Sequence, residues 1–497
     1  MTAKRPNFRR TTATALLLLS SCLAGPAMAE TLQGALAKAY ASNPTLTGAR
    51  AGQRATDENV PLQKANGRPA ADVSGSYSES ILKPTISFTA PQRTVNAQAQ
   101  LNVPIYSGGT VRNGVKAAKT RVAAGQANLR GTEASVFSQT VAAYMDVIRD
   151  SAIVALNQAN VKVLDVNLQA TNDRFEVGDL TRTDVAQSES RLALARSDLQ
   201  IAQSNLITSR ENYIALVGEA PDNLEPPPQL PGLPANPETA VQVALRDNAD
   251  ILAAQKQREA RHYDAKAAKG GVLPRVSAFT QAGYTNYLHS LDSTALDANG
   301  NAVEGPQINK QAVAGVQLTI PLYQGGRPAA QVRQTQALES QAIEQEIEIE
   351  RGVIAQTRAA YASWQASLQT IDSNQKAVDA ASLSLEGVRA ENSVGSRTIL
   401  DILNAEQEAL NARVQLVSAR RNAYVAGFSL LAAMGHAEAD DLGLASGTLY
   451  DPMVNYDWVK GKWFDWDYGA APMPVATRTV DTLPQNANVS PETAQQP

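Results

Sequence analysis

The residues that could do chemistry are few in this chain, and they are widely spaced. Its three histidines, His262, His289 and His436, do not stand at the spacing of metal ligands. The Gly-Gly pairs lack the lysine of a phosphate-binding loop, and no serine stands in a nucleophile-elbow motif. The sequence therefore predicts no enzyme, no metal site and no cofactor.

Two polar interruptions break otherwise long helical patterns. They are Val177-Gly-Asp-Leu-Thr-Arg-Thr-Asp184 and Val394-Gly-Ser-Arg-Thr-Ile-Leu-Asp401. In each, a glycine suited to the end of one helix precedes Ser, Thr and Asp residues suited to the start of the next. The pattern predicts two tight turns between antiparallel helices.

These turns belong to a two-fold internal repeat. The stretch Leu101–Gly109 nearly matches Leu318–Gly326, 217 residues later. The same offset carries Tyr144 onto Tyr361, Asp184 onto Asp401 and Gly218 onto Gly435. One constant spacing over about 118 residues indicates a duplicated unit.

Each repeat also carries one β-hairpin pattern. Residues 95–103 alternate small apolar side chains with Asn and Gln, and residues 312–320 do so with Val313 as the exception. Weaker strand patterns precede them at about 72–80 and 276–287. The second hairpin is 12 residues longer, most plausibly within 288–310.

Such two-faced strands suit lipid on one side and water on the other, or equally a soluble sandwich. A lone hairpin cannot bury itself, and beyond the first 29 residues no run of roughly 18 apolar residues predicts a membrane helix. We therefore expect a closed transmembrane β-barrel. Four strands per chain are fewer than the smallest barrels use, so several copies are required.

The helical patterns are too long for a globular core. The first, about 111–175, would span roughly 100 Å at 1.5 Å per residue. It fits either an isolated antiparallel coiled-coil hairpin or a wall of many helices, and the Ala, Ser and Thr on its flanks favour the wall. Prolines mark the passages between helix and strand in both repeats, because proline suits a change of backbone geometry. They are Pro69, Pro104, Pro274 and Pro321.

The pattern divides the chain into six parts. Residues 1–29 read as a secretory signal peptide, with lipidation at Cys22 as an alternative. The first repeat spans 30–222, a Pro-rich linker 223–237 and the second repeat 238–436. An aromatic segment, 437–468, is expected to pack on the helices, with a lipid-interface belt as the less favoured interpretation. A disordered tail is expected over 469–497. Without the four basic residues of the signal, 40 Lys and Arg face 48 Asp and Glu, a net charge of about −8 that does not suit nucleic acid.

From Glu30 to about Gly435 the chain resembles the TolC family of outer-membrane efflux and secretion ducts. The residues that carry the resemblance best are Leu318-Thr-Ile-Pro-Leu-Tyr-Gln-Gly-Gly326 and Val394–Asp401. It implies an α+β fold in which a homotrimer forms a 12-stranded barrel in outer-membrane lipid and a 12-helix tunnel through the periplasm. The implied partners are a periplasmic adaptor protein and an inner-membrane transporter of the ABC or RND type.

The resemblance also implies roles for single residues. The adaptor-contacting tips would be Val177, Gly178, Asp179, Val394, Gly395, Ser396 and Arg397. The tunnel constriction would be formed by Thr183, Asp184, Arg397, Asp401 and Asn404. A helix cap or a solvated charge is the alternative for Asp184, Arg397 and Asp401. Asn392 and Asn404 depart from the family pattern, which has a tyrosine and a second aspartate there, so the latch and the acidic ring would differ.

The resulting hypothesis is a passive export duct in the outer membrane of a Gram-negative bacterium. A periplasmic adaptor is the alternative, because adaptors also carry long helical hairpins. It would lack membrane-facing strands. Neither the cargo nor the transporter can be read from the residues, because a tunnel lined by Gln, Asn and Ser recognises nothing specific.

Overall fold

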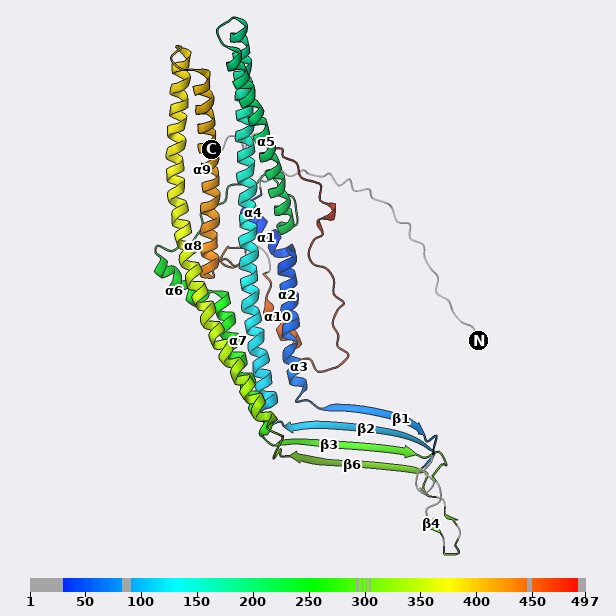
Figure 1. The fold of residues 1–497 in the computed structure, drawn as a ribbon. Coiled ribbons are helices and arrows are strands. Elements are labelled where there is room, and N and C mark those ends of the chain that lie inside the picture. Colours follow the sequence, from blue (N-terminus) through cyan, green and yellow to red (C-terminus); the bar gives the residue numbers. More distant parts are fainter. Residues whose placement is uncertain are drawn as a thin grey trace, which may run out of the picture.

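The computed structural model describes residues 30–82, 91–291, 295–296, 298–300, 302–303, 305–444 and 449–489. The predicted signal peptide and residues 490–497 of the predicted tail lie outside these ranges. The chain forms an elongated bundle of helices with a sheet at one end, opposite the tips of two helical hairpins (Figure 1).

The first half begins with three short helices. They are α1 (Leu32–Ser42), α2 (Pro44–Asp57) and α3 (Asn59–Ala65). The first break is a true restart, because Asn43 Oδ1 accepts the backbone N–H groups of Thr45 and Leu46 while Pro44 occupies the first helical position. One helix thus ends at Ser42, and another starts at Pro44 with its own cap.

The remaining elements of the first half are long. Strands β1 (Ala70–Glu79) and β2 (Arg93–Tyr106) are followed by α4 (Thr110–Glu176) and α5 (Arg182–Val217). Helix α4 has 67 residues, so it spans about 100 Å. The predicted helix of 111–175 is correct to within one residue at each end.

The second half follows the same order. Its elements are α6 (Pro237–Asp247), α7 (Ala249–Lys269), a 3₁₀ turn (Gly270–Val272), β3 (Arg275–Asn286), β6 (Ile308–Thr319), α8 (Arg327–Ser393) and α9 (Ile399–Met434). Helices α8 and α9 have 67 and 36 residues, the same lengths as α4 and α5. Between β3 and β6 lie two short strands that the sequence does not predict, β4 (Ala295–Leu296) and β5 (Ala302–Val303).

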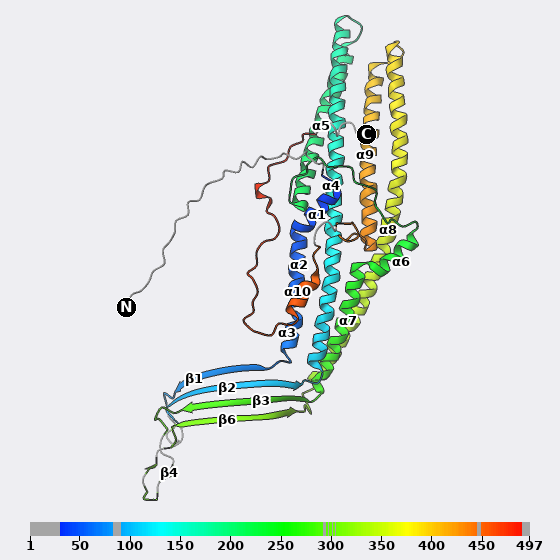
Figure 2. The same cartoon turned by 180° about the vertical axis from the view of Figure 1, so that it is seen from behind.

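The four long strands form one antiparallel sheet in the order β1-β2-β3-β6. Strand β2 joins the two halves by pairing with β3, so the hairpins of the two repeats lie side by side (Figure 2). Among the described residues, the outer edges of β1 and β6 pair with no other strand. No helix in the described ranges is long and apolar enough to cross a membrane.

Helix α4 lies at the centre of the bundle. It packs against α5, α7, α9 and the three N-terminal helices, and its middle contributes Phe137, Val141 and Tyr144 to the largest apolar cluster. Helix α8 lies at the side of the bundle, against α7 and α9 (Figure 1). The small flanking residues predict a wall of helices packed side by side. One chain contributes several such helices, and α8 lies at the edge of this group.

The C-terminal segment returns along the N-terminal helices. Helix α10 (Pro452–Val459) packs on α2, and a short 3₁₀ turn spans Thr479–Asp481. The described part of the tail contacts the helices near its end. Arg210 Nη1 and Nη2 donate to the carbonyl oxygens of Asn486 and Asn488, at 2.5 and 2.8 Å, and Val489 packs on the main apolar cluster.

Candidate functional site

The sheet has one mainly apolar face, on which Thr280 and Lys310 are exceptions, and one mainly polar face. Directly opposite residues of antiparallel strands point to the same side. On one side Ala99 lies between Val73 and Ala282, which in turn pairs with Ala312. The next position along β2, on the other side, is Gln98, between Ser74 and Gly283. The polar face has two large apolar exceptions, Phe279 and Val313.

The four junction prolines occupy the ends of the strands nearest the helices. Pro69 and Pro274 immediately precede β1 and β3. Pro104 lies near the end of β2, where the pairing with β3 shifts register, and Pro321 follows two residues after β6. These positions are where a residue without a backbone N–H removes the least from the ladder.

The predicted tip turns join α4 to α5 and α8 to α9 at the end of the bundle farthest from the sheet (Figure 1). Gly178 and Gly395 have φ of 80° and 83°, a left-handed conformation that glycine adopts without strain. Val177 and Val394 just before them are each 79% exposed. Two apolar side chains thus stand in solvent at equivalent places, together with Asp179 and Ser396.

Asp184 and Asp401 act as helix caps within their own turns. Asp401 Oδ2 accepts the backbone N–H and the hydroxyl of Thr398, at 3.0 and 2.8 Å, while the Asp401 N–H donates to Thr398 Oγ1. Asp184 makes the same set of bonds with Thr181. These hydrogen bonds favour the charged carboxylate and lower the pKa of both aspartates. Both are therefore ionised at neutral pH.

Arg397 contacts its own hairpin rather than the other one. Its Nε donates to Glu391 Oε2 at 2.7 Å, and this bond with the carboxylate raises the pKa of Arg397. Asn392 Nδ2 donates to the carbonyl oxygen of Arg397 at 2.7 Å and fixes the same turn. Among the contacts of the described residues, none joins Arg397 to Thr183 or Asp184 within one chain. The part of these residues in the tunnel constriction stays a prediction.

The link between the hairpins instead comes from a residue that the sequence did not indicate. Arg191 on α5 donates from Nη2 to Asn404 Oδ1 on α9, at 2.6 Å. Beside it Leu403 is only 2% exposed and packs on Leu164 and Leu192. Asn404, which departs from the family pattern, thus accepts a bond that joins the two hairpins. It lies about one helical turn after Asp401 along α9.

A second link lies nearer the middle of the bundle. Arg421 on α9 donates from Nε and Nη2 to the two carboxylate oxygens of Asp146 on α4, at 2.8 and 3.1 Å. Arg149 bridges Asp146 and Asp150, and the buried Asp150 accepts a short hydrogen bond from Ser209 on α5. This network joins α4, α5 and α9, and no motif in the sequence marks it.

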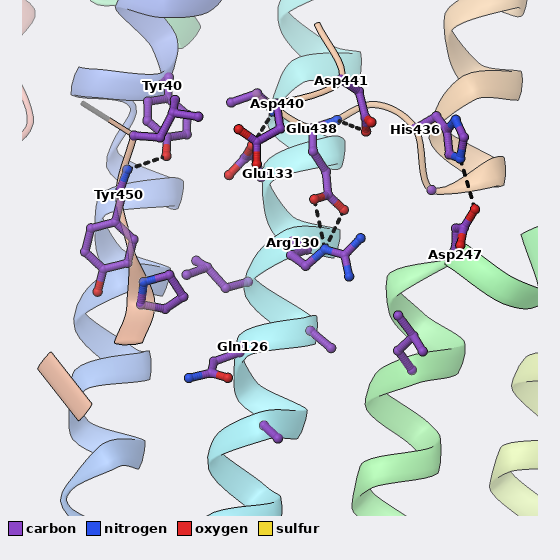
Figure 3. A pocket seen from close by; sticks show the side chains of 18 of the residues that line it. Tyr40, Gln126, Arg130, Glu133, Asp247, His436, Glu438, Asp440, Asp441 and Tyr450 are labelled. Atoms are coloured by element: carbon purple, nitrogen blue, oxygen red, sulfur yellow. Dashed lines mark hydrogen bonds and ion pairs between the residues drawn. The ribbon is translucent and has the colours of Figure 1, made fainter. Parts of the chain in front are cut away.

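A cavity of about 810 Å³ lies where the chain leaves α9 and crosses α4 (Figure 3). Arg130 Nε donates to both carboxylate oxygens of Glu438, at 2.7 and 2.8 Å, and Asp247 lies 3.1 Å from His436 Nε2. Burial raises the pKa of Glu133, although the Ala439 N–H donates to its carboxylate. These pairs connect the chain after α9 to α4 and to the end of α6. No cluster in the described ranges could hold a metal ion.

The structure is thus an elongated group of helices with a two-faced sheet at one end and two helical tips at the other. The sequence places the chain in a known family. Residues 35–219 and 240–436 match the outer membrane efflux protein family, and the chain belongs to that family. Each match corresponds to one half of the chain.

Two curated relatives and one solved structure agree with this assignment. The outer membrane efflux protein BepC of Brucella suis is 36% identical over 454 residues, 91% of this chain and 95% of that protein. The outer membrane protein TolC of Escherichia coli is 27% identical over 319 residues, 63% of this chain and 64% of its own length. The CmeC outer membrane channel of Campylobacter jejuni shares the fold with a TM-score of 0.70 at 16% identity, covering 92% of this chain and 98% of that one.

The resemblance inferred from Leu318–Gly326 and Val394–Asp401 is therefore confirmed at the level of the family. The protein is an outer-membrane efflux or secretion channel that extends into the periplasm, and its family is one of channels rather than enzymes. The alternative of a periplasmic adaptor is not favoured.

Proposed function

We propose that the chain is one third of a passive export duct, in which three copies close a 12-stranded barrel in the outer membrane and continue it as a 12-helix tunnel. The observation that carries this proposal is the open sheet. Its four strands have one apolar face, and both edges, β1 and β6, lack a partner within the described residues. Exposed edges with unpaired backbone groups are costly in lipid, and closure with other copies satisfies them.

The number three follows from size. Two copies would give eight strands, whose interior side chains fill, so three is the smallest number that leaves an aqueous channel. The apolar face around Ala99 and Ala282 would contact lipid, and the polar face around Gln98 and Gln311 would line the water. Strands of 10 to 14 residues are long enough to cross the bilayer at a tilt.

The helical wall supports the same assembly. Helix α8 leaves large apolar side chains exposed, among them Ile343 at 41% and Ile347 at 38%. Residues four apart lie on the same face of a helix, so these two isoleucines form an apolar strip suited to a neighbouring helix. In the proposed trimer a neighbouring copy covers them.

We further propose that the helical tips bind a periplasmic adaptor and that an inner-membrane transporter, of the ABC or RND type, supplies the energy. Val177 and Val394 offer two equivalent apolar contacts, and Gly178 and Gly395 let an approaching helix come close to the backbone. Cysteines at Asp179 and Ser396 test this: crosslinking in cells should capture an adaptor. A matched cysteine at Glu348, about a third of the way along α8 from its sheet end, should capture none.

We assign the constriction to Thr183, Asp184, Arg397, Asp401 and Asn404, which stand in or just after the tip turns. In a trimer three Asp401 carboxylates would form an acidic ring that prefers cations. Such a ring is charged at neutral pH, since hydrogen bonds from Thr398 lower the pKa of Asp401.

Planar bilayers test the duct and its constriction together. The purified protein should conduct ions, and Asp401→Asn should lower the ratio of cation to anion permeability. Arg191→Ala should increase conductance severalfold, because it removes the bond to Asn404 that holds the hairpins together. Arg196→Ala, on the exposed side of the same helix, is the control and should leave conductance unchanged. Assembled protein that does not conduct would exclude the duct.

A further inference from the structure

An exposed aromatic loop follows α10. Within residues 460–469, called here the aromatic loop, Phe464 is 77% exposed, Trp466 and Tyr468 are each 83% exposed, and Trp463 is 57% exposed. Four large aromatic side chains in ten residues form an apolar surface that is unfavourable in water. Proteins place such surfaces against a partner or a membrane.

Specific contacts within the aromatic loop fix its conformation. Lys462 Nζ lies 2.9 Å from Asp467 Oδ1, and the same ammonium lies 3.2 Å from the ring centroid of Trp458. The Asp467 N–H donates to the carbonyl oxygen of Phe464. The loop is thus closed on itself, and its aromatic side chains are displayed outward.

Two cations fix the aromatic loop at the point where helix becomes sheet. Arg68 stands just before β1, and its Nη1 donates to the carbonyl oxygen of Lys462 at 2.7 Å while its guanidinium lies 4.4 Å from the Trp463 ring centroid. Lys64, at the end of α3, donates from Nζ to the carbonyl oxygen of Lys460 at 2.6 Å. Figures 1 and 2 show that α10, which leads into the loop, lies on the sheet side of the bundle.

We infer that the aromatic loop lies in the phospholipid headgroup layer on the periplasmic side of the outer membrane. This inference rests on the proposed function, because it takes the sheet as the membrane-spanning part. The α3–β1 junction is then the level of the membrane surface. Tryptophan and tyrosine prefer that level, since one end of each ring system is apolar and the other can hydrogen-bond to water.

Other residues at the same level agree with a lipid contact. Tyr106 and Tyr323 follow the junction prolines of β2 and β6 and are 49% and 88% exposed, so aromatic side chains recur around this end of the sheet. Barrels in outer membranes carry aromatic girdles at both interfaces. The guanidinium of Arg68 adds a cation suited to a phosphate headgroup. The aromatic loop would extend the girdle from the strands to the C-terminal segment.

Tryptophan fluorescence tests the inference directly. The chain has four tryptophans, of which Trp458, Trp463 and Trp466 belong to this region and Trp364 packs against Leu430 in the helical part. The variant Trp364→Phe with Trp458→Phe leaves only the two tryptophans of the aromatic loop. It is reconstituted in phosphatidylcholine vesicles whose acyl chains are brominated either near the headgroup or deep in the bilayer.

Bromine near the headgroup should quench the emission at least twofold, and deep bromine should quench it clearly less. A matched variant that keeps only Trp364 should be quenched by neither lipid. If the aromatic loop instead packs on a second copy, its emission is blue-shifted in detergent and unquenched in both lipids, which overturns the inference. Conductance of the same vesicles separates the two proposals. Vesicles that conduct but leave the loop tryptophans unquenched would contradict only the membrane position of the aromatic loop. Protein that neither inserts nor conducts would contradict the proposed duct.

Discussion

Helices α4 and α8 have the same length, follow the same Pro-x-Tyr-x-Gly-Gly pattern and end in the same kind of turn, yet their surroundings differ. Twenty-two of the 67 residues of α4 are buried, against five of the 67 of α8. The N-terminal helices and the C-terminal segment cover α4, while one side of α8 is uncovered by the described residues. Two copies of one sequence pattern thus serve as a central helix and as an edge helix.

The largest expected effect comes from charging the edge helix. Ile343→Glu with Ile347→Glu on α8 should abolish the trimer, because unpaired charges would have to be buried against the neighbouring copy. Crosslinking followed by mass measurement in detergent should show at least about a tenfold loss of trimer. The matched variant Ile343→Leu with Ile347→Leu should assemble normally. A charged variant that still assembles would mean that this side of α8 faces water.

The next effect concerns the second of the two links between the hairpins, the pair of Arg421 with Asp146. Arg421→Ala breaks the bidentate pair with Asp146, whose side chain is 25% exposed, and should lower the free energy of unfolding by about 2 kcal/mol. Thermal melting in detergent measures this change. Arg196→Ala breaks a pair whose partners are about 60% exposed and should cost less than about 0.5 kcal/mol. Equal losses would show that the central network is no better sheltered than the surface.

The repeat-related tyrosines sharpen the comparison further. Tyr144 is fully buried, and its hydroxyl lies 2.8 and 2.6 Å from the carbonyl oxygens of Glu30 and Glu225. The hydroxyl of Tyr361 donates to the carbonyl oxygen of Ala235 at an exposed site. Tyr144→Phe should therefore cost about 1.5 kcal/mol and Tyr361→Phe about 0.5 kcal/mol in the same melts. A larger loss of stability from Tyr361→Phe would contradict the assignment of α4 as the central helix and α8 as the edge helix.

The smallest effect is expected at the tips, where the two halves are alike. Thr181→Ala and Thr398→Ala each remove a capping box, so the first-turn amides of α5 and α9 should exchange roughly fivefold faster. Hydrogen exchange followed by mass spectrometry resolves both turns. Thr183→Ala, two residues after Thr181 and outside the capping box, is the control and should leave these exchange rates unchanged. Unequal effects of the two caps would show that a neighbouring copy shields one tip.

Acid should act on both caps in the same way. The folded-state pKa of Asp184 and Asp401 lies below the ordinary value of about 4, so their stabilisation is complete above that pH and is lost as the pH falls through the lowered pKa. At neutral pH a small change of pH should leave the protection of the tip amides unchanged, once their exchange is compared with that of an unstructured peptide at the same pH. Protection that falls between pH 7 and pH 5 would contradict this sign.

Much of the fold could be predicted because its signals are local. Alternation predicts the strands, uninterrupted length predicts α4 and α8, and prolines mark the junctions to within a few residues. The cap role of Asp401 could also be predicted, since Thr398-x-x-Asp401 is a capping-box spacing. The sequence could not decide between a helix cap and a tunnel charge, because the same aspartate suits both roles.

The bonds between hairpins were beyond the sequence for a physical reason. Whether Arg191 meets Asn404, or Arg421 meets Asp146, depends on how each helix is rotated about its axis. Packing far from those residues sets this rotation. The position of the aromatic loop was harder still to predict. It depends on single hydrogen bonds from Arg68 and Lys64, which lie more than 390 residues earlier in the chain.

The central claim is that the open edges of the sheet close on other copies, and disulfide crosslinking between β1 and β6 tests it most directly. These strands lie at opposite edges of the sheet, so they cannot meet within one chain. A variant with Ser76→Cys is combined in turn with Gln311→Cys, Val313→Cys or Gly315→Cys, all on the polar face. The account predicts that at least one pair yields covalent trimers and no larger species. Only monomers, or ladders that run past three copies, would contradict it.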